Sequence, residues 1–113
     1  MSSNIVTLST VPLAAGATFT GNFEQVPAYG AGIYYTWIVG LSSSDQAGTI
    51  YVEQSMDGAH PLRSDPLNTA ADSLGNQSSL LKVQMVYPYV RVKYTNGATK
   101  QTTFTLTRNF SIN

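Results

Sequence analysis

Residues 89–109 read YVRVKYTNGATKQTTFTLTRN and carry the clearest structural pattern in the chain. Val90 and Val92 alternate with polar side chains, and the second half of the stretch alternates in the same way. A period of two places one set of side chains inward and the other toward solvent. Asn96-Gly97 lies between the halves and is a turn signal, because both residue types tolerate positive φ. The stretch therefore predicts an antiparallel pair of strands with one solvated face.

The same alternation recurs along the chain, punctuated by glycine and proline. It predicts seven strands, at residues 5–10, 17–25, 33–41, 48–55, 80–87, 89–95 and 102–109. The inward-facing set is expected to be Phe19, Phe23, Ile33, Tyr35, Trp37, Val39, Ile50, Val52, Leu81, Val83, Met85, Val90, Val92, Phe104 and Leu106. A single sheet would leave these apolar side chains exposed to water, whereas two facing sheets bury them. We predict an all-β fold, a two-sheet antiparallel β-sandwich that is jelly-roll-like, with about seven or eight strands.

The 113 residues are expected to form one domain, residues 1–113, with an irregular loop at about 59–79. That segment holds two prolines, the single histidine and little periodicity. Loops of this length in compact domains are uncommon, and they are either functional or mobile. Both interpretations stay open.

Composition limits the function. Charged residues make up 11% of the chain, against about 25% in typical globular domains. Neutral polar residues take their place, as is usual in extracellular and virion β proteins. The net charge is zero and there is no cysteine, so we expect neither a nucleic-acid partner nor a disulfide framework.

The N-terminus lacks the pattern of a signal peptide, and the most apolar window, 33–41, is too short to cross a bilayer. We therefore expect no membrane partner.

The charges are unevenly placed along the chain. The acids of the middle segment are Asp45, Glu53, Asp57, Asp65 and Asp72, with only Arg63 among them. After residue 79 come Lys82, Arg91, Lys93, Lys100 and Arg108, with no acid. These groups either neutralise each other within one sandwich or join an acidic patch to a basic patch on the next copy in a ring.

No residue pattern favours catalysis. His60 is the sole imidazole, lies beside Pro61 and has no nucleophile motif near it. Glu53 and Asp57 could act as the paired carboxylates of glycoside hydrolysis, but one belongs to a strand surface and the other to a turn. Asp57, Asp65 and Asp72 could bind calcium, but their spacing fits no EF-hand loop. We predict that the protein is not an enzyme and needs no metal or cofactor.

The seven tyrosines suggest a binding surface. Tyrosine is enriched at protein interfaces, and aromatic faces also stack on sugars. The interface candidates are Tyr34, Tyr51, Tyr89, Arg91, Lys93, Asp57, Asp65 and Asp72.

Two segments resemble small tailed-phage virion β-sandwich proteins of the capsid decoration or accessory type. They are residues 47–58, AGTIYVEQSMDG, and residues 89–104, YVRVKYTNGATKQTTF. The chain departs from that pattern at His60-Pro61, where an aromatic residue is common. The resemblance implies a structural protein without catalytic residues, made in the host cytoplasm and carried on the capsid surface. It also implies the major capsid protein as partner and a homotrimer. The alternative is a carbohydrate- or receptor-binding β module of a phage tail fibre.

Overall fold

The computed structural model describes residues 4–26, 36–69 and 78–112. This part of the chain is all strand and loop. Its strands are β1 (Asn4–Ser9), β2 (Thr18–Thr20), β3 (Glu24–Gln25), β4 (Thr36–Ser44), β5 (Gly48–Ser55), β6 (Pro61–Thr69), β7 (Ser78–Gln84), β8 (Tyr89–Asn96) and β9 (Phe104–Ile112). Within these ranges no helix is long and apolar enough to span a membrane.

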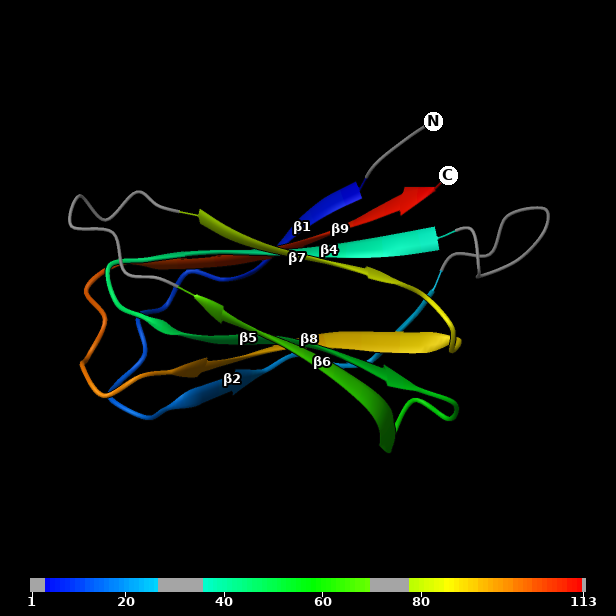
Figure 1. The fold of residues 1–113 in the computed structure, drawn as a ribbon, viewed down its shortest axis with the longest axis horizontal. Coiled ribbons are helices and arrows are strands. Elements are labelled where there is room, and N and C mark those ends of the chain that lie inside the picture. Colours follow the sequence, from blue (N-terminus) through cyan, green and yellow to red (C-terminus); the bar gives the residue numbers. More distant parts are fainter. Residues whose placement is uncertain (1–3, 27–35, 70–77, 113) are drawn as a thin grey trace.

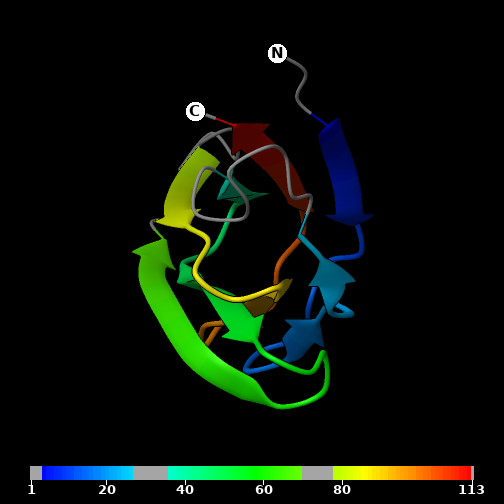
Figure 2. The same ribbon diagram turned by 90° about the vertical axis from the view of Figure 1, so that its right-hand side faces the viewer.

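The strands form two antiparallel sheets stacked face to face, as Figures 1 and 2 show. One sheet has the order β1-β9-β4-β7, and the other has the order β2-β8-β5-β6, with β3 also paired to β8. Antiparallel pairs surround the β5–β6 turn one outside another, in the order β5–β6, β4–β7 and β1–β9. Between the last two, β8 pairs with both β2 and β3. A long antiparallel ribbon wound into two sheets in this way is a jelly roll. The predicted all-β, jelly-roll-like sandwich is confirmed.

The core lies between the sheets and is built by alternate residues of the long strands. Its fully buried members include Ile38, Ile50, Val52, Met85, Val90, Val92, Tyr94 and Leu106. Phe19 and Leu81 are partly buried and pack against this cluster. The predicted inward phase is therefore correct for β5, β7, β8 and β9.

The predicted phase of β4 is wrong. Ile38 is 1% exposed, whereas Trp37 and Val39 lie on the outer side of the sheet and are only partly buried. The strand is apolar on both sides at this point, so hydrophobicity could not choose between the two phases. Packing decides, because β4 passes so close to β5 that a Cβ at Gly40 would lie 3.0 Å from Ile50. Gly40 and the inward serines of β4 therefore face the core together with Ile38, and the indole lies outside. The predicted Ile33 and Tyr35 positions fall outside the described residues.

β8 and β9 do not form the predicted hairpin, because β8 belongs to one sheet and β9 to the other. The buried Asn96 does not occupy a tight turn. Its side-chain amide donates to the backbone carbonyls of Leu13, Ala14 and Thr99, at 2.9–3.2 Å, and so joins two loops. Gly97 is required for a close approach, since a Cβ there would lie 2.6 Å from the carbonyl oxygen of Ala47.

The predicted irregular loop at 59–79 is wrong for residues 61–69, which form strand β6 at the sheet edge. Proline is tolerated on an edge strand because one side of its backbone has no strand to bond. Residues 70–77 lie outside the described ranges. The predicted strand 17–25 is in fact two short strands, which are separated at Gly21.

Candidate interaction face

Four of the proposed interface residues lie together on the outer face of the β2-β8-β5-β6 sheet. Tyr51 on β5 pairs in register with Lys93 on β8, and Arg91 and Tyr89 occupy the next two outward positions along β8. Tyr34 and Asp72 are outside the described residues. Asp57 lies in the β5–β6 turn, and Asp65 is in register with the inward-facing Val52, so it belongs to the other side of the sheet.

A buried carboxylate organises this surface. Glu53 on β5 is 6% exposed, although it points outward. Its Oε1 accepts from Arg91 Nε at 2.8 Å, and Lys93 Nζ lies 3.5 Å from its Oε2. The two cations cover the carboxylate and are held in place by it. Since a buried ion pair leaves an uncompensated charge if one member is removed, these three residues act as one unit.

Aromatic rings support both cations. The Arg91 guanidinium lies 4.4 Å from the centroid of the Phe23 ring, and Lys93 Nζ lies 4.7 Å from that of Tyr51. Phe23 was predicted to face inward, but it lies on the outer side, between β2 and β3. No signal in the sequence could reveal this, because the chain leaves the regular strand pattern there. We define the aromatic–basic face as Phe23, Tyr51, Glu53, Tyr89, Arg91 and Lys93.

The Gln-Ser-x-Asp-Gly motif at 54–58 has a structural role beside this face. Gln54 is fully buried, and its Oε1 accepts from the backbone N–H groups of Val86 and Tyr87 at 2.8 and 3.1 Å. It thus ties β5 to the loop between β7 and β8. Gly58 has φ of 77° and packs under the ring of Tyr89. The motif therefore shapes the β5–β6 turn and places the Tyr89 ring.

Asp57 completes the turn. Its carboxylate accepts hydrogen bonds from the His60 ring, from the His60 and Ala59 backbone N–H groups and from the Ser55 hydroxyl. These bonds, the His60 ring first, hold the pKa of Asp57 well below its usual range. The Ser55 hydroxyl bonds the carboxylate and not the imidazole, so the three side chains do not have the order of a catalytic triad.

Several of the unevenly placed charges neutralise each other within the sandwich. Glu53 pairs with two bases of β8, Arg63 pairs with Asp65, and Arg108 pairs with Glu24 across the two sheets. Asp45 instead accepts from the Thr102 hydroxyl and backbone N–H, which holds its pKa well below the usual range. Of the pairings expected between the middle acids and the later bases, the described residues show Glu53 with Arg91 and Lys93. Across the described ranges, no three His, Asp or Glu side chains are placed to hold a metal ion.

These features define a jelly-roll β-sandwich domain with an ordered aromatic and cationic outer surface. The chain belongs to the family described as the uncharacterised protein YqxG N-terminal domain, which it matches over residues 1–111. No curated protein matches it.

Two solved structures share the fold. The crystal structure of the PBSX exported protein XepA matches with a TM-score of 0.80 and 21% identity, over 97% of this chain and 37% of that chain. The structure of the Gx strain of infectious bursal disease virus matches with a TM-score of 0.58 and 10% identity, over 96% of this chain and 31% of that one. The chain thus spans about a third of the length of each matched chain. At such identities the likeness concerns the fold alone.

Proposed function

We propose that this protein is a phage virion structural protein, a capsid decoration or accessory protein that acts by binding and not by catalysis. The aromatic–basic face is the observation that carries the proposal. The resemblance of residues 47–58 and 89–104 to tailed-phage virion proteins supports the phage assignment. The shared jelly-roll fold of XepA and of a virus structure is consistent with it.

The proposed mechanism is mechanical. Tyrosine and arginine are the residue types that most often dominate binding energy at protein interfaces. Here Glu53 and the rings of Phe23 and Tyr51 already hold Arg91 and Lys93 in place, so little side-chain entropy is lost on binding. The partner is the major capsid protein, and many small contacts repeated across a lattice add up to strong attachment.

The test is the copy number of the protein in purified virions, measured by quantitative mass spectrometry. A lattice protein is present in copies on the order of hundreds, whereas a tail component is present in a few to tens. The double variant Tyr51→Ala/Tyr89→Ala should lower the occupancy, and Lys82→Ala, on the outer side of the other sheet, should not. Full occupancy of the double variant would refute the aromatic–basic face as the contact.

A carbohydrate- or receptor-binding module of a tail fibre is the second candidate function. A mixed polar and apolar groove at the open edge of the sandwich favours it. Low copy number, together with impaired adsorption to host cells after deletion of the gene, would select this function over the first.

We also propose that the chain self-associates, as a trimer, the number that the phage resemblance implies. Since Glu53, Glu24 and Asp65 are paired within the chain, contacts of the partly exposed aromatic rings would carry most of the affinity. Sedimentation at low and high salt tests this. If the protein stays a monomer at every protein and salt concentration, self-association in solution is refuted and assembly on the virion alone is left.

A further inference from the structure

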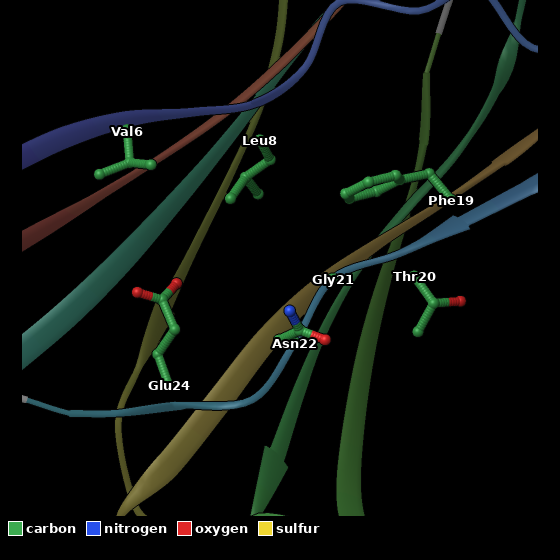
Figure 3. A pocket seen from close by; sticks show the side chains of 7 residues that line it. All are labelled: Val6, Leu8, Phe19, Thr20, Gly21, Asn22 and Glu24. Atoms are coloured by element: carbon green, nitrogen blue, oxygen red, sulfur yellow. The ribbon is translucent and has the colours of Figure 1, made fainter.

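A groove opens at one side of the sandwich, between the edge strand β1 of one sheet and β2 and β3 of the other. Its volume is about 370 Å³, and its lining residues are Val6, Leu8, Phe19, Thr20, Gly21, Asn22 and Glu24. Figure 3 shows Leu8, Phe19, Asn22 and Glu24 around the same space, with contributions from both sheets. This volume lies at the lower end of the range of small-molecule sites, about 300–1,000 Å³. The groove is separate from the aromatic–basic face.

One wall of the groove is a carboxylate held by a buried cation. Glu24 on β3 accepts from Arg108 on β9, with Nε to Oε2 at 2.9 Å and Nη2 to Oε1 as the second bond. The Arg108 side chain is 7% exposed and lies over the ring of Phe110. Arg108 therefore fixes the orientation of the carboxylate from the buried side, while the Glu24 side chain is 35% exposed.

This ion pair leaves useful hydrogen-bonding capacity. Each carboxylate oxygen has two acceptor sites, and Arg108 occupies one on each oxygen. Each oxygen can accept one further hydrogen bond, and because these two open sites lie on opposite edges of the carboxylate, one of them can accept from a ligand hydroxyl. Asn22 adds amide donors and an acceptor, and its side chain forms no hydrogen bond with any described residue.

The remaining lining selects among ligands. Val6, Leu8 and Phe19 present carbon surfaces suited to the C–H face of a ring. Among the lining residues that the structure describes, Glu24 is the only charged one, and Arg108 pairs with it. Because the ion pair has no net charge, a ligand of either sign would lose hydration in the groove without gaining a counter-charge. A compact, uncharged molecule with hydroxyl groups and an apolar face fits these features.

We propose that this groove binds a neutral sugar of one or two rings. Glu24 accepts from one hydroxyl, Asn22 bonds a second polar group, and Phe19 contacts the ring face. The proposal rests on the second candidate function, whose groove it uses, but its test measures sugar binding directly, so its failure is distinguishable from the outcome of the copy-number test.

The probes are glucose, galactose, N-acetylglucosamine and their common disaccharides, with glucuronate as a charged counterpart. Binding is followed by NMR through the backbone amide signals of Gly21 and Asn22, with sugar at tens of millimolar. We expect saturable shifts of these signals with at least one neutral sugar and weaker shifts with glucuronate. No shift with any sugar of the panel, or equal binding of glucuronate, would overturn the proposal.

Variants test the assigned contacts. Asn22→Ala removes an exposed amide that supports no other described group, and it should weaken binding about fivefold. Phe19→Ala should weaken it about tenfold or more, and its fold is checked by circular dichroism. Glu24 is left intact, since its removal would strand the buried Arg108 charge. Tyr51→Ala, on the aromatic–basic face, should bind sugar as the parent does; equal loss in this control would place the site elsewhere.

Discussion

Truncation of adjacent residues on β4 distinguishes the observed phase of the strand from the opposite one. Ile38 is 1% exposed and belongs to the core between the sheets. Replacing such a residue by alanine costs about 2–5 kcal/mol, from lost transfer energy and the cavity left behind. A domain of this size loses about 4 °C in Tm per kcal/mol, so Ile38→Ala should melt about 8–20 °C below the parent.

Trp37→Ala should cost much less, despite the larger side chain. The indole is partly exposed on the outer face, where Lys82 Nζ lies 4.9 Å from the ring centroid. The variant loses an exposed cation–π contact, about 0.5–1 kcal/mol, and a part of the apolar contact of the ring. We expect a total of about 1–2 kcal/mol.

Urea unfolding followed by far-ultraviolet circular dichroism measures both variants, because Trp37→Ala removes the only tryptophan fluorophore. A matched pair controls for side-chain size. Val39→Ala lies on the outer side and should change stability by less than about 1 kcal/mol, whereas Val92→Ala, at 2% exposed, should cost about 2 kcal/mol. If Trp37→Ala destabilised the protein at least as much as Ile38→Ala, the observed phase of β4 would be refuted.

Three further perturbations follow from the loops. Gln54→Ala leaves two backbone N–H groups of the β7–β8 loop without their acceptor, so it should lower the free energy of unfolding by about 2–4 kcal/mol in urea titrations; a change below about 0.5 kcal/mol would contradict this role. Gly97→Ala brings a Cβ to 2.6 Å from the carbonyl oxygen of Ala47, a backbone atom that cannot rotate away. The variant should therefore have a lower Tm in calorimetry, and an unchanged Tm would contradict this. Asp45 and Asp57 have folded-state pKa values below the unfolded value of 3.8, so their stabilising contribution is complete above that pH and is lost as pH falls through the folded pKa. The double variant Asp45→Asn/Asp57→Asn should therefore show a flatter decline of Tm from about pH 5 to about pH 2, and an identical slope would argue against these bonds.

The candidate face was partly predictable. Tyr51, Tyr89, Arg91 and Lys93 follow from strand alternation, because outward positions of one strand share a face. The burial of Glu53 could not be predicted from its charge, since it comes from two cations on a neighbouring strand. The pairing of charges within the chain likewise depends on strand order. Glu24 and Arg108 are 84 residues apart and meet only across the two sheets.

The sequence by itself determined the all-β class, the positions of most strands and the inward phase of those with one apolar side. These properties depend on backbone conformation and on a period of two, which are local. Tertiary structure alone decided three matters. It chose the inward side of β4, which is apolar on both sides, by the close approach of Gly40 to Ile50. It separated β8 from β9 into different sheets, because Asn96 bonds distant loops and forms no tight turn. It made Pro61–Thr69 an edge strand, since pairing with β5 outweighs a weak local pattern. In each case the deciding contact joins different strands or loops, and no local periodicity encodes it.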